Sequence, residues 1–289
     1  MSLSKTPAAS SSGDDCDADV GFTTRILIQG LYPYKRQDSI TRSMQAGPWR
    51  MTVTSPNGIP YGKYPRLVMA YLVTQAVQRQ NLPPDEARRI PLGRSINDFL
   101  SRMGIATRGT GGKQTGNLRI LREQLRRLST STVTVEHLGR ADRDAGANMM
   151  IVQRWELWWG ANAHQEPLEE SWIQLTPDFY EEIIAHPVPI DLDMLRGLSR
   201  PRAMDIYMWS TARRYRLKAD LHLDWDAIQS QFGADVQNTS QAKRDFRKDF
   251  KKAVAEVMDV WPDAGLTVTP DGLILAKGRP SVLPRRSRH

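Results

Sequence analysis

Residues 225–260 read WDAIQSQFGADVQNTSQAKRDFRKDFKKAVAEVMDV, and this stretch decides the expected fold. The amphipathic segment Trp225–Phe232 stops at Gly233, and glycine is common just after the last residue of a helix. After the polar loop Ala234–Ser240, apolar residues return at helical spacing in Gln241–Val260. We therefore expect a short helix, a turn and a long helix, which is the order of a helix-turn-helix.

The elements on either side extend this pattern. Arg202–Leu217 is predicted to be a helix, and Leu221–Leu223 a short strand. Downstream, Leu266–Thr269 and Leu273–Lys277 are predicted to form a hairpin that turns at Asp271–Gly272. Helix, strand, helix, loop, long helix and hairpin is the order of a winged helix-turn-helix. In that architecture the last helix enters the major groove, and the hairpin reaches the DNA backbone or the minor groove.

The first half of the chain repeats this order. The predicted elements are a strand Trp49–Thr54, a helix Tyr64–Gln80, a short strand Arg89–Leu92, a helix Ile96–Met103 capped by Ser95, a long basic helix Lys113–Leu128, and two β-rich segments, Thr132–His137 and Met149–Trp159, separated by the polar turn Gly139–Asn148. A constant offset of 129 residues pairs Leu92 with Leu221, Gly104 with Gly233 and Leu121 with Phe250. Because apolar, glycine and cationic positions stay in phase together, we expect a duplicated domain.

The expected fold class is therefore α+β, with two tandem winged helix-turn-helix domains related by a pseudo-duplication. A disordered Ser-rich and acidic leader is expected over residues 1–24. The other expected parts are an N-terminal winged-helix domain over 25–171, a linker with a short helix over 172–189, a C-terminal winged-helix domain over 190–278, and a basic tail over 279–289. The prolines of His186-Pro-Val-Pro189 restrict the linker, so we expect the domains to be held at a fixed relative angle.

The charge balance favours a polyanionic partner. The 289 residues include 40 Lys and Arg against 32 Asp and Glu, which gives a formal net charge of +8 and a sequence pI of about 9.7. A pI above about 9 is typical of nucleic-acid binders. In the first long helix the cations form a stripe beside the apolar stripe, and in the second they spread around the side opposite the apolar face. In each helix one face can therefore pack while another binds DNA. Solvated amphipathic helices would explain either one alone, but two in equivalent positions favour DNA binding.

The candidate DNA-binding residues lie in the first turns or on the charged faces of these two helices. They are Lys113, Gln114, Thr115, Asn117, Arg119, Arg122 and Arg126 in the first helix, and Lys243, Arg244, Arg247, Lys248 and Lys251 in the second. Residues near the start of such a helix commonly reach base edges, whereas cations bind phosphates. Phe246 and Phe250 share the apolar stripe with Ala253 and Val257, so we expect them to be core residues.

The residue patterns of several enzyme classes are missing from the sequence. Gly109-Thr-Gly-Gly-Lys-Gln114 departs from a phosphate-binding loop, because Thr107 stands where glycine is required and Gln114 replaces Ser or Thr. The five histidines lack metal-ligand spacing, and the single cysteine, Cys16, lies in the leader. We therefore expect a protein that is not an enzyme, with no cofactor and no metal site. Trp155, Trp158 and Trp159 are expected to pack in the core or between domains rather than to stack on bases.

Several stretches resemble the RepA-type initiators of plasmid replication. They are Gly58–Arg66 with the Leu67–Leu72 segment that follows, Ser95–Leu100, Thr110–Lys113, Trp155–Trp159, His186–Asp191, Ala203–Trp209, Ile228–Asp235 and Phe246–Pro262. The resemblance as a whole covers about residues 30–277. The resemblance implies tandem winged-helix domains that bind repeated sites, or iterons, at a plasmid origin. It also implies that Lys113–Arg127 and Lys243–Lys252 face the DNA. Such initiators help to open A·T-rich DNA and to recruit host replication proteins, such as a helicase or initiator.

The expected function is therefore origin binding in plasmid replication, through double-stranded DNA and host replication proteins. The longest apolar run, Leu67–Val73, is too short to span a membrane, so we expect a cytoplasmic protein with no membrane partner. Homodimerisation off DNA is left open. The alternative is a winged-helix transcriptional repressor without an initiator role, and a rolling-circle nickase is disfavoured because its metal site is missing.

Overall fold

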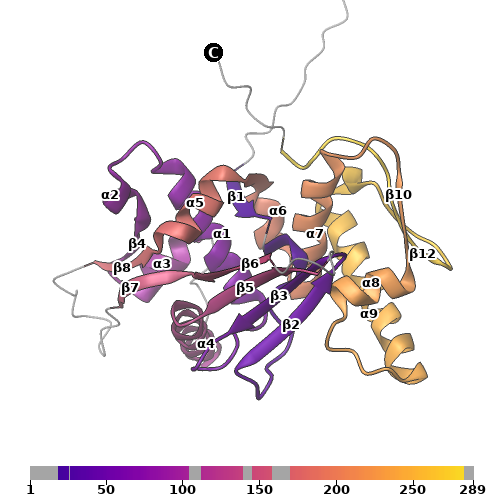
Figure 1. Ribbon diagram of the computed structural model, residues 1–289, viewed down its shortest axis with the longest axis horizontal. Coiled ribbons are helices and arrows are strands. Elements are labelled where there is room, and N and C mark those ends of the chain that lie inside the picture. The colour runs from indigo at the N-terminus through magenta and orange to yellow at the C-terminus, as the bar shows by residue number, and fades with distance from the viewer. Residues whose placement is uncertain (1–18, 26, 104–111, 139–144, 158–169, 283–289) are drawn as a thin grey trace, which may run out of the picture.

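The structure, a computed structural model, describes residues 19–25, 27–103, 112–138, 145–157 and 170–282 (Figure 1). Its secondary structure is mixed α and β. Helices α1 (Lys63–Gln78) and α7 (Pro201–Arg214) contact each other and are buried along most of their lengths. The buried apolar side chains on both sides of this helix pair form one continuous core. The two halves of the chain therefore share their interior.

The C-terminal half forms a unit of three helices and a three-stranded sheet. After α7 come β10 (Leu221–Asp224), α8 (Trp225–Phe232), α9 (Ser240–Val260), η2 (Pro262–Ala264), β11 (Leu266–Val268) and β12 (Gly272–Leu275). Strand β12 lies between β10 and β11 and is antiparallel to both. Thr239 caps the N-terminus of α9: its hydroxyl accepts a hydrogen bond of 3.2 Å from the Ala242 amide. The predicted helix–turn–helix and hairpin are confirmed, and α8 has the predicted bounds. We call α7–β12 the C-terminal unit.

The N-terminal half contains the same order of elements. After α1 come α2 (Pro84–Arg88), β4 (Arg89–Gly93), α3 (Ile96–Arg102), α4 (Gly112–Ser129), and later β7 (Val152–Glu156) and β8 (Ser171–Leu175). Strand β8 lies between β4 and β7, so the sheet order is first, third, second, as in the C-terminal half. The predicted N-terminal cap of α3 is present: the Ser95 hydroxyl accepts a hydrogen bond from the Asp98 amide. We call α1, β4, α3, α4, β7 and β8 the N-terminal unit.

The hairpin that directly follows α4 is not the counterpart of the C-terminal hairpin. Strands β5 (Thr132–His137) and β6 (Ala145–Met150) join β2 (Thr41–Ala46) and β3 (Trp49–Thr54) in a separate antiparallel sheet, ordered β2-β3-β5-β6 (Figure 1). The prediction of a turn over Gly139–Asn148 is therefore wrong for residues 145–148, which pair with β5.

The prediction of one β-rich segment over Met149–Trp159 is also wrong, because two strands in different sheets meet there. Ile151 separates them: its side chain is fully buried, and its amide donates to the Ser131 carbonyl. The burial of this one residue directs β7 into the sheet with β8. The strand that pairs with β7 to make the N-terminal hairpin is thus β8, inside the stretch predicted to be a linker.

The leader and linker predictions also need correction where the structure describes them. Residues 20–24, predicted to be disordered, form β1 (Val20–Thr24), which pairs with β9 (Pro187–Asp191). Helix α5 (Pro177–Ala185) has the predicted bounds, but strands β8 and β9 flank it, and α6 (Leu192–Gly197) follows. The chain between the units therefore contributes strands to two sheets. Strand β8 pairs with β4 and β7, and β9 pairs with β1, which lies far away in the sequence.

A buried ion pair joins the two units. Two nitrogens of Arg66 on α1 donate to the two carboxylate oxygens of Asp205 on α7, each at 2.7 Å, and the side chains are 3% and 2% exposed. Arg66 also donates to the Tyr32 carbonyl. Burial opposes the charge of Arg66, but the Asp205 carboxylate outweighs it and holds the pKa of Arg66 above its ordinary value. The pair is fully satisfied, and removing one partner would leave a buried charge uncompensated.

We predict that Asp205→Asn lowers the free energy of unfolding by about 3–5 kcal/mol, because it leaves the buried Arg66 guanidinium without its counter-charge. Denaturant unfolding followed by circular dichroism measures the change. Asp38→Asn is the matched control, since the side chains of Asp38 and its partner Arg36 are 97% and 62% exposed. Exposed pairs contribute about 0–1 kcal/mol. Equal losses in the two variants would show that the Arg66–Asp205 pair does not stabilise the junction.

Candidate nucleic-acid interface

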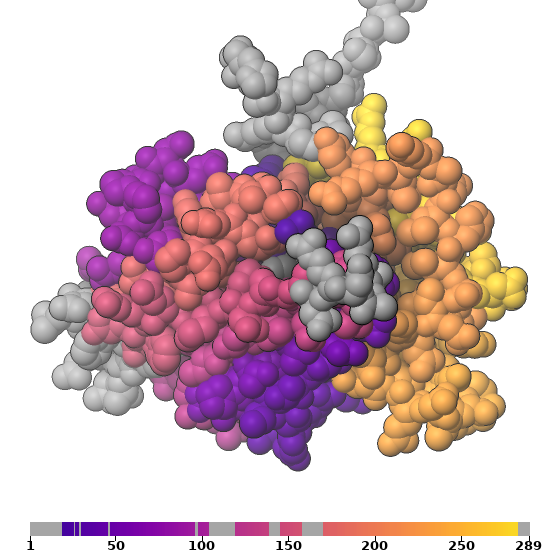
Figure 2. Space-filling view, in the orientation of Figure 1, coloured from indigo at the N-terminus to yellow at the C-terminus, as the bar shows by residue number. Residues whose placement is uncertain are grey.

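Helix α9 separates its apolar and charged faces as the sequence predicts. Phe246 and Phe250 are 4% and 0% exposed, and Ala253 and Val257 are buried with them, so the core assignment is confirmed. Arg244, Arg247, Lys248 and Lys251 are exposed, and Lys243 is half-buried. The N-terminal part of α9 projects from the molecule at the lower right of Figures 1 and 2. These five cations therefore lie on one accessible helix.

Two acidic residues among the cations of α9 have partners of their own. Asp249 pairs with Arg202 of α7, and the Arg202 guanidinium also lies over the rings of Tyr34, at 4.6 Å, and Phe246, at 5.1 Å. Asp245 accepts two hydrogen bonds of 3.0 Å from the amide of Gln241. Because Asp249 is neutralised by a residue of the neighbouring helix, it reduces the positive potential of α9 less than its formal charge suggests.

Helix α4 carries the second set of cations. Arg119, Arg122 and Arg126 are exposed, while Leu121 and Leu125 on the adjacent face are fully buried. Lys113, Gln114, Thr115 and Asn117 fall within the helix, but their side chains lie outside the described residues. In Figure 1, α4 and α9 lie at the lower left and lower right, with the sheet β2-β3-β5-β6 between them. The candidates thus form two separate basic surfaces.

Arg127 does not face the solvent, although the family resemblance implies a DNA-facing helix up to this residue. Its side chain is 7% exposed, and its guanidinium donates to the Ile59 carbonyl at 2.9 Å and to Glu123 at 2.6 Å. It also lies over the Tyr61 ring. The physical reason is its position on α4, one turn after Glu123 and against the segment that leads into α1. Arg127 therefore holds α4 in place and is not available to DNA.

The structure places an aromatic residue of the N-terminal hairpin differently from the prediction. Trp155 on β7 is 43% exposed, so its assignment to the core is wrong, and Trp158 and Trp159 lie outside the described residues. On the neighbouring strands, the Arg89 guanidinium stacks over Trp172 at 4.2 Å, a contact that sequence reasoning missed. The relevant signal is pairing between β4 and β8, which lie more than 80 residues apart, and no local pattern reveals it.

The described residues bear on two kinds of feature, a metal-ligand cluster and a membrane-spanning helix. No three His, Cys, Asp or Glu side chains gather there as metal ligands would. Of the stretch Gly109–Gln114, which departs from a phosphate-binding loop, residues 109–111 lie outside the described ranges and residues 112–114 belong to α4. Within those ranges, no helix combines the length and apolarity needed to cross a membrane. The arrangement is suited to binding an extended polyanion.

Comparisons with known proteins identify a family and a similar fold. A family model for plasmid-encoded RepA protein matches residues 59–227. No curated protein matches the chain. Among solved structures, a selenomethionine derivative of domains 2 and 3 of RctB is similar, with a TM-score of 0.57 and 12% identity, covering 89% of this chain and 97% of that chain. A second structure of RctB domains 2–3 has a TM-score of 0.53 and 13% identity, covering 87% and 96%. At these identities the likeness concerns the fold alone.

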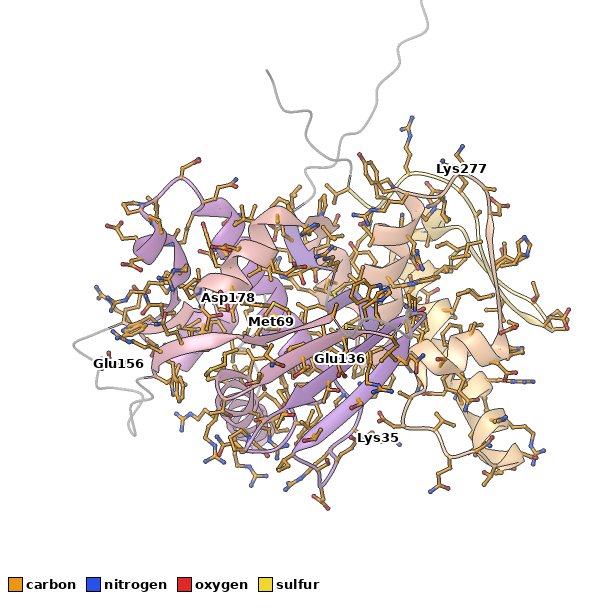
Figure 3. All side chains as sticks on the ribbon, viewed as in Figure 1. Lys35, Met69, Glu136, Glu156, Asp178 and Lys277 are labelled. Atoms are coloured by element: carbon orange, nitrogen blue, oxygen red, sulfur yellow. The ribbon has the colours of Figure 1, made fainter. Side chains whose placement is uncertain are left out.

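We predict that Arg244→Ala and Lys248→Ala each reduce the slope of log binding constant against log salt concentration by about one unit on random-sequence double-stranded DNA, because each removes one phosphate contact. Fluorescence anisotropy at several salt concentrations measures the slope. Lys277→Ala is the control: this exposed lysine also belongs to the C-terminal half but lies at the upper right of Figure 3, away from the N-terminal part of α9. Unchanged slopes for both α9 variants would exclude this face from the DNA interface.

Proposed function

Because the chain belongs to the family of plasmid-encoded RepA proteins, we propose that it initiates plasmid replication by binding repeated sites at the plasmid origin through two winged-helix domains. The family makes it a plasmid replication protein. The two winged-helix domains, the iterons as their sites and the residues in contact are our proposal. The N-terminal and C-terminal units correspond to the two domains.

The observation that carries this proposal is the repeated topology. Both units have helix, strand, helix, helix and two strands, and in both the last strand lies between the first and second. A winged helix-turn-helix has this arrangement, and its third helix enters the major groove. The third helices here are α4 and α9, which carry the exposed cations. Arg119, Arg122 and Arg126 would bind one groove segment, and Lys243, Arg244, Arg247, Lys248 and Lys251 the next.

The junction between the units supports binding by a single chain. A satisfied buried ion pair and a continuous core oppose independent rotation of the units. Winged-helix half-sites on successive turns lie about 10 bp, or 34 Å, apart. One chain would then bind two unlike half-sites within one direct repeat, because the exposed residues of α4 and α9 differ.

Opening of A·T-rich DNA and recruitment of host replication proteins, such as a helicase or initiator, complete the proposed role. Neither step requires a reaction catalysed by this chain, so the proposed role is that of a non-enzymatic DNA-binding protein. Its proposed location is the cytoplasm, where the plasmid is replicated. Homodimerisation off DNA is compatible with this role.

A mini-plasmid that carries the gene and its flanking repeats should replicate in its host, with copy number measured by quantitative PCR. The charge-reversed variant Arg244→Glu/Lys248→Glu should abolish replication, because like charges repel DNA phosphates. The Lys277→Ala variant should replicate normally. A protein that binds the repeats and represses its own promoter, yet cannot support the mini-plasmid, would be the transcriptional repressor instead.

A further inference from the structure

Trp225 connects three elements of the C-terminal unit. It is the first residue of α8 and only 6% of it is exposed. Its indole N–H donates to the Pro270 carbonyl in the turn of the hairpin at 2.8 Å. Its ring meets Phe250 of α9 edge-on, with centroids 6.0 Å apart. One side chain thus fixes the hairpin turn relative to both helices.

The same indole lies under two of the exposed cations. The Arg247 guanidinium carbon is 5.2 Å from the ring centroid, and the Lys251 ammonium is 5.8 Å from it. These residues are four apart on α9, and like charges at that spacing repel each other. The face of an indole attracts cations through its quadrupole. Trp225 therefore offsets the repulsion and restricts where the two charged groups lie.

A groove beside this cluster joins the helix to the hairpin. It runs between α9 and β11, and its lining residues are Lys251, Val254, Ala255, Val268, Thr269 and Pro270. Two of these lining residues, Lys251 on α9 and Pro270 in the hairpin turn, contact Trp225. The shape of the groove and the position of its cation thus depend on one buried ring.

We propose that Trp225 is a positioning residue for DNA binding: it sets Arg247 and Lys251 to receive DNA phosphates and holds the hairpin turn beside α9. This inference rests on the proposed function. Trp225 is buried, so it acts through the two cations and Pro270 without contacting DNA. The offset of 129 residues pairs Trp225 with Ile96, which has an aliphatic side chain. An aromatic ring at this position is therefore a feature of the C-terminal unit and not of the N-terminal unit.

Double-mutant cycles on random-sequence double-stranded DNA test this role. Trp225→Leu removes the aromatic face, and Arg247→Ala removes one cation above it. Lys248→Ala is the matched control, since among the described residues the cations over the Trp225 ring are Arg247 and Lys251 and not Lys248. We expect the fold-loss of affinity caused by Arg247→Ala to be about 2- to 5-fold smaller in the Trp225→Leu background than in the wild type, as cation–π energies imply. The fold-loss caused by Lys248→Ala should be the same in both backgrounds.

A purely structural role for Trp225 gives a different result. It would lower affinity by one factor in every background and leave no coupling with Arg247, and that outcome would overturn the inference. Trp225→Phe is the conservative variant: it keeps an aromatic face of smaller area and removes the N–H donor to Pro270. It should restore most of the Arg247 coupling, and circular dichroism checks that each variant is folded. If Arg247→Ala has no effect on the DNA affinity of the wild-type protein, the proposed DNA-binding surface is wrong. This outcome differs from an absence of coupling, which would contradict only the positioning role of Trp225.

Discussion

The buried bidentate ion pair between Arg66 and Asp205 is the constraint on which the relative placement of α4 and α9 depends. On one side, Arg66 belongs to α1, and the segment before α1 holds α4: Ile59 accepts from Arg127, and the Tyr61 amide donates to Gln124. On the other side, Asp205 belongs to α7. One turn earlier on α7, Arg202 binds Asp249 and covers Phe246 of α9. The ion pair therefore lies midway in a chain of contacts between the two basic helices.

A second set of contacts fixes the C-terminal unit from another direction. Arg42 on β2 donates three hydrogen bonds to Asp235, in the loop between α8 and α9, and also donates to the Gly30 and Leu31 carbonyls. The sheet β2-β3-β5-β6, which lies outside both repeated units, thus contacts the turn that leads into α9. Because a charged side chain 5% exposed is costly to leave unpaired, this contact opposes separation of the units.

Local patterns predict the longer helices well, because helical periodicity and caps are short-range signals, but the short helices α2 and α6 were not predicted. Helices α5 and α8 have the predicted bounds, and the Phe246–Phe250 stripe of α9 is buried as expected. Pairing between distant strands was not predictable in the same way. Strand β6 reads AGANMM, which has few β-branched residues, and β1 and β9 pair across most of the chain.

In the candidate site, too, short-range features were predictable and contacts between distant residues were not. Sequence alone separates the charged stripe of α9 from its apolar stripe, yet it cannot distinguish the buried Arg127 from the exposed Arg126. That difference depends on the Ile59 carbonyl, which lies 68 residues away. The position of Trp225 beneath Arg247 and Lys251 likewise arises from the packing of α8 against α9 and the hairpin, which no spacing rule encodes.

The central claim is that one chain presents α4 and α9 to two successive major grooves in a fixed arrangement. Inserting 5 bp, about half a helical turn, inside a single origin repeat tests it most directly, because the insertion rotates one half-site away from the other. Footprinting and affinity measurements on the two DNAs should show one protected repeat per chain on the native sequence and loss of high-affinity binding on the insertion. Undiminished binding to the DNA with the insertion would contradict the account, since it would require units that move independently or a single unit that contacts DNA.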